Sequence, residues 1–228
     1  MNSPVARPAP SPAPAARFIV FEGGEASGKS TQAARLADRL GAVLTHEPGG
    51  TAIGAALRTL LLSDDAHTTE LDDRAEALLM AADRAQHVAE VVRPALAAGR
   101  HVVSDRYIGS TLAYQGFGRG LPVDDLRRLS VWAAAGLWPD VVVLLDVPRG
   151  LASTRAAGRA DPAPDRLEAA GDGFHERVAR GYRALAAADP ARWVVVDGAA
   201  PTDEVEAAVW KSLVSRCPEL APRPSTPD

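Results

Sequence analysis

Five short apolar runs alternate with longer stretches of helical periodicity along the middle of the chain. The runs span residues 18–21, 42–45, 101–104, 141–145 and 193–196. Their apolar residues are continuous and rich in β-branched types, which is typical of strands covered on both faces. The stretches between them predict helices at residues 29–40, 51–62, 70–98, 122–135, 171–188 and 202–215. This alternation predicts an α/β fold of three layers, in which helices flank a central parallel five-stranded sheet.

Proline-rich segments close both ends of the chain. Residues 1–16 hold five prolines and residues 218–228 hold four, out of 18 in the whole sequence. Such segments bury little apolar surface, and their prolines cannot donate backbone hydrogen bonds. We therefore predict disordered tails at residues 1–16 and 216–228, on either side of one domain at residues 17–215.

A charged segment at residues 156–168 interrupts the alternation of strands and helices. It contains a glycine and two prolines and has few apolar residues to bury. These features predict a mobile lid of about residues 151–171. The alternative is a plain surface connection.

A phosphate-binding loop follows the first apolar run. Residues 23–30 read Gly-Gly-Glu-Ala-Ser-Gly-Lys-Ser, which matches the pattern G-x-x-x-x-G-K-[ST] between a predicted strand and a predicted helix. Lys29 would meet the β- and γ-phosphates of ATP, and the Ser30 hydroxyl would ligate Mg²⁺. A glycine turn with a chance Lys-Ser pair is the alternative. The residues predicted to bind ATP are Gly23, Gly24, Glu25, Ala26, Ser27, Gly28, Lys29, Ser30 and Thr31.

One carboxylate inside this loop points to a second ligand. Glu25 would repel the phosphates that the loop attracts. We therefore expect its side chain to turn away from them, toward a ligand that offers a hydroxyl group. A solvent-facing side chain is the alternative.

Residues after the second and third runs suggest where that ligand binds. In an open parallel sheet, ligands bind beyond the carboxyl ends of the strands. Asp105 and Arg106 end the third run. There Asp105 could hold a water molecule of the magnesium ion, and Arg106 could grip an acceptor phosphate through two oxygens. A structural ion pair between Asp105 and Arg106 is the alternative.

The predicted helices nearby carry further candidates. Thr51 follows a Pro-Gly-Gly turn and would cap the next helix, which carries Arg58. Met80, Asp83 and Arg84 share one face of a later helix. An apolar residue beside an Asp-Arg pair suits a base that is packed on one side and hydrogen-bonded on the other. The alternatives are a surface arginine at position 58, and a core methionine beside a surface ion pair.

In their order and spacing, these motifs together resemble the thymidylate kinase family over about residues 17–200. The residues that carry the resemblance are Phe-Glu-Gly-x-Glu at 21–25, Glu-Pro-Gly-Gly-Thr at 47–51, Ala-Asp-Arg-Ala-Gln-His at 82–87, Asp-Arg-Tyr at 105–107, Ser110, Ala-Tyr-Gln-Gly at 113–116, Pro-Asp at 139–140, Leu-Leu-Asp-Val at 144–147 and Asp-Arg-Leu-Glu at 165–168. The resemblance implies a P-loop NTPase fold of the nucleoside monophosphate kinase type. It also implies a homodimer that uses ATP and Mg²⁺ to phosphorylate dTMP to dTDP.

The resemblance also implies roles for single residues. Glu25 would accept a hydrogen bond from the 3′-hydroxyl of dTMP, and Tyr114 would exclude a 2′-hydroxyl. Met80 stands where the family usually has the phenylalanine that stacks on thymine, and His46 stands where arginine is common. The residues implied to bind dTMP are Glu25, Pro48, Arg58, Met80, Arg84, Arg106, Ser110, Thr111, Tyr114 and Gln115, with Ser30 and Asp105 at the metal.

The phosphate loop has no basic residue besides Lys29, so the chain resembles the bacterial class that supplies arginines from the lid. Arg155, Arg159 and Arg166 are the lid arginines. Arg155 would also stack on adenine. The implied catalytic set is Lys29, Asp105, Arg106, Arg155, Arg159 and Arg166.

Bulk composition excludes several other classes of protein. The net charge of -4 gives no basic excess that would favour nucleic acid. A lone cysteine, Cys217, forms neither an internal disulfide nor a cysteine metal cage. No apolar stretch reaches the roughly 20 residues that span a membrane. The N-terminus lacks the apolar centre of a signal peptide, so we expect a cytoplasmic enzyme.

Two other functions stay open at this point. One is a kinase for another deoxynucleotide or for a deoxynucleoside, although Arg106 favours a monophosphate and Tyr114 a deoxy sugar. The other is a P-loop ATPase or switch protein that binds partners. The sequence contains no Asn/Thr-Lys-x-Asp guanine motif.

Overall fold

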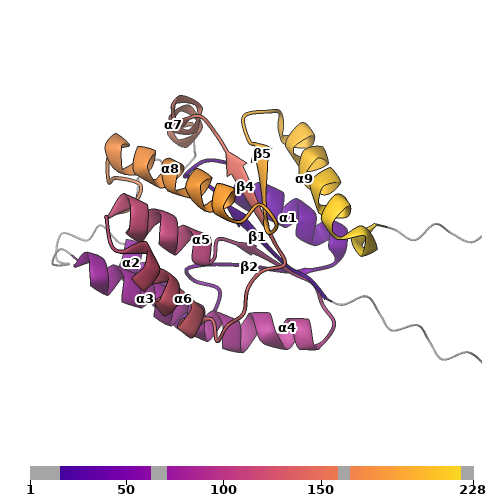
Figure 1. The fold of residues 1–228 in the computed structure, drawn as a ribbon, viewed down its shortest axis with the longest axis horizontal. Coiled ribbons are helices and arrows are strands. Elements are labelled where there is room, and N and C mark those ends of the chain that lie inside the picture. Colours follow the sequence, from indigo (N-terminus) through magenta and orange to yellow (C-terminus); the bar gives the residue numbers. More distant parts are fainter. Residues whose placement is uncertain (1–15, 63–70, 159–164, 222–228) are drawn as a thin grey trace, which may run out of the picture.

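The architecture is a five-stranded parallel sheet between two layers of helices (Figure 1). The computed structural model describes residues 16–62, 71–158 and 165–221. The strand order is β2-β3-β1-β4-β5, and every pair is parallel. The strands are β1 (Phe18–Glu22), β2 (Val43–His46), β3 (Val102–Asp105), β4 (Val141–Asp146) and β5 (Trp193–Asp197). The predicted fold class and all five strands are confirmed.

Helices α1 and α9 cover one face of the sheet, and α3, α5, α6 and α8 lie over the other (Figure 1). The helices are α1 (Lys29–Leu40), α2 (Ala52–Leu62), α3 (Asp73–His87), α4 (Arg93–Ala97), α5 (Ile108–Thr111), α6 (Val123–Ala133), α7 (Arg149–Ala157), α8 (Asp172–Ala188) and α9 (Thr202–Arg216). A π-helical turn, Val88–Val92, joins α3 to α4, and another, Leu112–Gly118, extends α5. The predicted helices are confirmed to within a few residues at their ends, whereas α5 with its π-helical turn and α7 had not been predicted.

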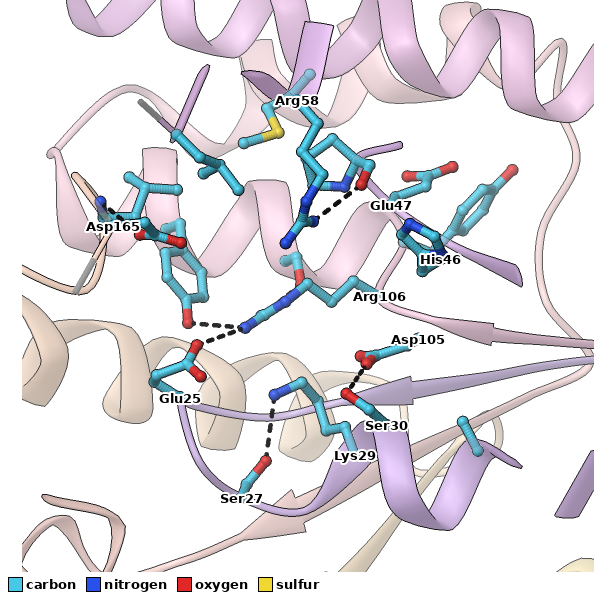
Figure 2. Close-up of a pocket in the computed structure, with 18 of the residues that line it drawn as sticks. Glu25, Ser27, Lys29, Ser30, His46, Glu47, Arg58, Asp105, Arg106 and Asp165 are labelled. Atoms are coloured by element: carbon cyan, nitrogen blue, oxygen red, sulfur yellow. Dashed lines mark hydrogen bonds and ion pairs between the residues drawn. The ribbon is translucent and has the colours of Figure 1, made fainter. Parts of the chain in front are cut away.

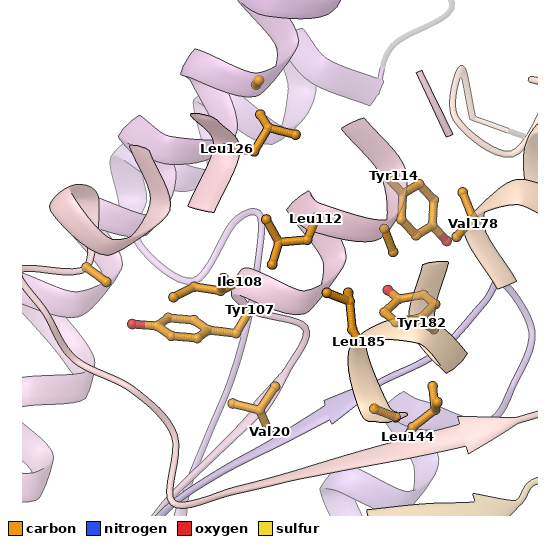
Figure 3. Packing of buried hydrophobic residues seen from close by; sticks show 14 of the residues in the cluster. Val20, Tyr107, Ile108, Leu112, Tyr114, Leu126, Leu144, Val178, Tyr182 and Leu185 are labelled. Atoms are coloured by element: carbon orange, nitrogen blue, oxygen red, sulfur yellow. The ribbon is translucent and has the colours of Figure 1, made fainter. Parts of the chain in front are cut away.

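Successive residues of β1 enter two separate apolar layers. Phe18 and Val20 face the layer beneath α3, α5 and α8, while Ile19 and Phe21 face the layer beneath α1 and α9. Figure 3 shows the first layer, in which Val20 of the sheet lies beneath Tyr107 and Ile108. Because both faces are covered, every residue of β1 is buried, and the strand is apolar without alternation.

The C-terminal segment is ordered further than the sequence indicates. Cys217 and Leu220 are buried against α1 and α9, and Pro218–Leu220 form a 3-10 turn. Proline suits the first position of such a turn because its missing N–H would have no partner there. The predicted tail at residues 216–228 is therefore wrong for residues 216–221. Residues 1–15 and 222–228 lie outside the described residues, so the rest of the tail prediction stays a prediction.

The two ends of the described chain meet at one side of the domain (Figure 1). Arg17 pairs with Glu219 at 2.7 Å and with Asp140 at 2.9 Å, which ties the start of β1 to the turn after α9. The phosphate-binding loop and α7 lie at the opposite, carboxyl end of the strands. No helix among the described residues is long and apolar enough to cross a bilayer.

The predicted lid covers two segments that the structure describes and, between them, residues that lie outside the described part of the chain. Residues 151–157 belong to α7, and residues 165–170 form turns before α8. Residues 159–164, with Arg159, lie outside the described residues. Mobility of this segment stays a prediction.

Candidate functional site

The phosphate-binding loop needs glycine for two physical reasons. Gly23 has a φ of 149°, and a Cβ there would lie 2.7 Å from the carbonyl oxygen of Leu145. Gly28 caps α1 with a φ of 88°, a left-handed conformation that side chains disfavour. The loop therefore places its chain close to β4 and directs the N-terminus of α1 at the cavity.

Lys29 is a buried cation without a carboxylate partner among the described residues. Its Nζ donates to the carbonyl oxygen of Gly24 at 2.7 Å and to the Ser27 hydroxyl at 3.3 Å. Burial, and next the positive charge of Arg106, lower the pKa of Lys29 to about 8. An anion bound in the loop would offset both effects, so this arrangement favours a phosphate ligand.

Ser30 and Asp105 meet across the cavity, as the sequence predicts. The Ser30 hydroxyl donates to Oδ2 of Asp105 at 2.5 Å (Figure 2). Oδ1 of Asp105 is buried and has no hydrogen-bond partner among the described residues. An oxygen pair with one unsatisfied carboxylate atom suits a hard divalent cation or its water shell.

Arg106 is held in place by groups from four parts of the chain. Its backbone has a φ of 73°, and its N–H donates to the Phe21 carbonyl at 2.9 Å. The guanidinium donates to Oε2 of Glu25 at 3.4 Å and to the hydroxyls of Tyr114 and Tyr182 at 3.3 and 3.4 Å. Glu25 therefore turns toward Arg106, and its expected contact with a hydroxyl group of a second ligand stays a prediction.

Glu22 supports the site from within the protein and was not predicted from the sequence. Its fully buried carboxylate accepts hydrogen bonds from the Ser110 hydroxyl at 2.6 Å and the Tyr182 hydroxyl at 3.1 Å. Backbone N–H groups of Tyr107 and Ser110 also donate to it, each at 3.0 Å. Burial raises the pKa of Glu22 to about 7. A charged residue at the end of an apolar strand was the available signal.

Ser110, predicted to bind dTMP, lines the cavity but is engaged within the protein. Its hydroxyl donates to Glu22 and accepts from Arg106 at 3.2 Å. These bonds make Ser110 a link between Glu22 and Arg106. The alternative of a structural ion pair between Asp105 and Arg106 is not found among the described residues, where Arg106 pairs with Glu25.

A second arginine faces Arg106 from the other side of the cavity. Arg58 of α2 and Arg106 point toward the same space (Figure 2). Arg58 Nη1 donates to the carbonyl oxygen of Pro48 at 3.0 Å, which fixes the side chain over the turn after β2. Two guanidinium groups that point into one space could hold a phosphate between them.

Arg84 is buried in a network that the sequence did not predict. It donates to Glu47 at 2.9 Å, to Thr111 at 3.0 Å and to Ser130 at 3.2 Å. The alternative of a surface ion pair between Asp83 and Arg84 is not found among the described residues, because Arg84 pairs with Glu47 and Asp83 accepts from the backbone N–H of Gly49 at 3.0 Å. The contact with Thr111 brings together two residues that the resemblance places at the base, and that role stays a prediction.

The lid arginines point in different directions. Arg155 lines the cavity and donates to the Gly198 carbonyl at 2.8 Å. Arg166 pairs with the buried carboxylate of Glu76 at 2.5 Å and does not line the cavity in the described structure. We expected Arg166 to approach the phosphates, but its guanidinium instead pairs with the buried carboxylate of Glu76.

Most of these groups line one cavity of about 770 Å³, which is large enough for two substrates end to end, whereas Glu22 and Arg166 lie behind its walls. Gly23 and Gly24 shape the loop from outside this cavity. The predicted residues that line it are Glu25, Ala26, Ser27, Gly28, Lys29, Ser30, Thr31, Pro48, Arg58, Met80, Arg84, Asp105, Arg106, Ser110, Thr111, Tyr114, Gln115 and Arg155. A phosphate-binding loop that faces a second anion site across one cavity defines a P-loop nucleotide kinase.

Comparison with known proteins narrows this class to one family. The sequence model of the thymidylate kinase family matches residues 21–209. A thymidylate kinase of Solidesulfovibrio magneticus is 54% identical over 204 residues, which are 85% of this chain and 96% of that protein. One from Synechococcus sp. (strain JA-3-3Ab) is 47% identical over 91% of this chain and 100% of its own length. The chain belongs to the thymidylate kinase family.

A solved structure supports the same assignment. The crystal structure of thymidylate kinase from Ehrlichia chaffeensis superposes with a TM-score of 0.70 at 31% sequence identity. The match covers 88% of this chain and 99% of that one. The resemblance found in the sequence is therefore confirmed at the level of family and fold.

Proposed function

We propose that this protein transfers the γ-phosphoryl group of ATP to dTMP, which yields dTDP and ADP. One observation carries the proposal: Arg58 and Arg106 face the phosphate-binding loop across a single cavity (Figure 2). A P-loop ATPase or switch protein has no need of a second anion site there. The thymidylate kinases that share about half of this sequence supply the identity of the acceptor.

The loop is proposed to hold the donor. Backbone N–H groups at the start of α1 and the charge of Lys29 meet the β- and γ-phosphates. Ser30 and Asp105 are the residues that would hold Mg²⁺, since their oxygens meet at 2.5 Å and one carboxylate oxygen lacks a partner among the described residues. When bound, the ion would offset negative charge on the phosphates.

The acceptor is proposed to lie between α2, α3 and the end of β3. Arg58 and Arg106 bind its phosphate, which is already ionised at neutral pH, so the reaction needs no general base. Glu25 accepts a hydrogen bond from the 3′-hydroxyl, and Tyr114 occupies the space of a 2′-hydroxyl. Catalysis then consists of positioning two phosphates and cancelling their repulsion.

The base is proposed to bind against α3. Met80 covers one face of thymine through its thioether. Arg84 reaches a base carbonyl, with Thr111 beside it at 3.0 Å. Pro48 and Gln115 complete the walls. Arg155 is proposed to act at the adenine and phosphates from α7, together with Arg159 and Arg166 once the donor is bound.

A homodimer is the proposed assembly. Leu78 of α3 and Trp132 of α6 are 57% and 81% exposed, and these two helices pack side by side. Large exposed apolar side chains on two adjacent helices suit a protein interface.

A panel of acceptors tests the function directly. Release of ADP from ATP and Mg²⁺ is measured with dTMP, dUMP, dCMP and thymidine. We expect kcat/KM to be highest for dTMP and negligible for thymidine, because thymidine offers Arg58 and Arg106 no phosphate. Fast ATP hydrolysis without any acceptor, or preference for a nucleoside, would contradict the proposal.

A further inference from the structure

A buried carboxylate lies next to the acceptor pocket and has no part in the mechanism above. Glu76, Met80 and Arg84 are spaced by four residues on α3, so they share one face of that helix. Met80 and Arg84 line the cavity, whereas Glu76 is fully buried one turn before them.

Three side chains from distant parts of the chain converge on Glu76. Arg119 donates to it at 3.1 Å, Arg166 at 2.5 Å and Gln115 at 2.7 Å. A buried carboxylate is costly unless charged and hydrogen-bonded groups offset it. Here two guanidinium groups and one amide do so, which fixes all four side chains together.

The contact between Gln115 and Glu76 orients an amide in the acceptor pocket. A carboxylate can only accept hydrogen bonds, so it holds the Nε2 end of the amide. The other end, Oε1, accepts no hydrogen bond from the described residues, and Gln115 lines the cavity. Gln115 therefore directs its carbonyl oxygen, a hydrogen-bond acceptor, into the pocket. If the amide were turned by 180°, this oxygen would lie against the carboxylate of Glu76, which is unfavourable.

The same carboxylate holds another wall of the pocket. Arg166 reaches Glu76 from the turns at residues 165–170 and also donates to the Leu61 carbonyl at 3.1 Å. Asp165, Leu167 and Glu168 of these turns line the cavity. Glu76 thus joins α3, the π-helical turn Leu112–Gly118 and the chain before α8.

We propose that Glu76 is a positioning residue that sets base selectivity by holding the carbonyl oxygen of Gln115 toward the acceptor base. Thymine and uracil carry a hydrogen-bond donor at N3, whereas cytosine carries an acceptor there and is disfavoured. The proposal rests on the proposed function, since it assumes a nucleoside monophosphate in this pocket.

The substitution Glu76→Gln tests the proposal, because glutamine can donate as well as accept and so permits Gln115 to turn over. The measured quantity is the ratio of kcat/KM for dTMP to that for dCMP. We expect the ratio to fall about tenfold or more, which corresponds to one hydrogen bond in a buried site. A folded Glu76→Gln protein that keeps the wild-type ratio overturns the proposal.

Matched variants separate this role from a merely structural one. Arg119→Gln removes another partner of Glu76 but leaves the contact with Gln115, so it should alter stability while the ratio stays within about twofold. In a Gln115→Met background, Glu76→Gln should change the ratio no further, because both act through one hydrogen bond. Additive effects on the ratio would contradict the proposal.

Two outcomes need separate treatment. If Glu76→Gln does not fold, Glu76→Asp takes its place, since it keeps the charge that the arginines need but falls short of Gln115. A wild-type ratio in Glu76→Asp then overturns the proposal. Wild-type protein that is inactive with dTMP refutes the proposed function, whereas selective wild-type protein with equally selective variants refutes only the role of Glu76.

Discussion

At the scale of single residues, the site buries charged groups whose cost substrates would offset. Lys29 is buried beside Arg106 and has only neutral hydrogen-bond partners among the described residues. Oδ1 of Asp105 is buried and has no hydrogen-bond partner among the described residues. A phosphate at Lys29 and a cation at Asp105 would offset these costs, so the buried charges favour the binding of both.

Removal of the charge on Lys29 should abolish transfer and leave the fold intact. For Lys29→Met we expect kcat to fall roughly 100-fold or more, since the transition state loses a buried cation beside its developing charge. The coupled assay with ATP and dTMP measures this, and circular dichroism checks the fold. Near-normal turnover in a folded variant would mean that Lys29 does not meet the transferred group.

The lowered pKa of Lys29 also predicts how stability depends on pH. Between pH 8 and about 10, Lys29 loses its proton in the folded protein but keeps it in the unfolded chain, whose lysine pKa is near 10.4. The unfolded state then binds more protons, so the free energy of unfolding rises with pH.

Chemical denaturation in phosphate-free buffer measures this effect. Relative to Lys29→Met, the ligand-free wild-type protein should gain roughly 2 kcal/mol between pH 7.5 and 9.5. Parallel pH profiles for the two proteins would show that burial does not lower the pKa of Lys29.

At the scale of elements, the hydrophobic pattern predicted the sheet and most helices because each is long or continuous enough to show its period. The run at residues 18–21 is apolar throughout, since β1 is covered on both faces. Helices α5 and α7 were not predicted from the sequence because they are short and partly determined by tertiary contacts. The order of residues 216–221 was not predicted because Pro218 suggested a tail, whereas Leu220 packs against α9.

The site residues that could be predicted are those that belong to short contiguous sequence motifs. The loop with Lys29 and the end of β3 with Arg106 carry their own motifs, and the topology of a parallel sheet brings them together. Partners across long sequence separations could not be foreseen. Glu22 and Glu76 bind groups 88 and 90 residues away, and nothing in the residues nearby indicates those contacts.

The close packing of α5 against the sheet gives a prediction at this scale. A Cβ at Gly109 would lie 2.7 Å from Oε1 of Glu22 and 2.9 Å from the ring of Trp193. Gly109→Ala should therefore destabilise the protein by about 1–3 kcal/mol and lower activity, because Glu22 supports Ser110 and Arg106.

Gly150→Ala in α7 is the matched control. Nothing lies within 4 Å of a Cβ at that position, so stability should stay the same or rise by a few tenths of a kcal/mol. Thermal denaturation of both variants measures the difference. Equal melting temperatures for Gly109→Ala and the wild type would show that the packing around Glu22 is loose.

At the scale of the whole molecule, the contacts that join the two ends of the described chain and the substrate cavity lie at opposite ends of the sheet. The two ends of the described chain meet at the amino end of the sheet through Arg17, Asp140 and Glu219. The cavity opens at the carboxyl end, where the loop, β2, β3 and α7 each contribute side chains. The homodimer is proposed to form at the exposed apolar side chains of α3 and α6, which are Leu78 and Trp132.

Substitution of this face tests the homodimer. Sedimentation equilibrium should give twice the mass of 23.8 kDa for the wild type. Trp132→Glu should shift the protein toward the monomer, because a charge at the centre of an apolar interface is costly. A monomeric wild type, or a dimer unaffected by Trp132→Glu, would refute this interface.

The central claim is that two phosphates meet between the loop and the pair Arg58 and Arg106. A crystal structure with dTMP, Mg²⁺ and a non-hydrolysable ATP analogue tests it most directly. We expect the dTMP phosphate to contact Arg58 and Arg106, with its 3′-hydroxyl at Glu25 and the γ-phosphate of the analogue at Lys29. A dTMP molecule bound away from Arg106 and Glu25 would contradict the account.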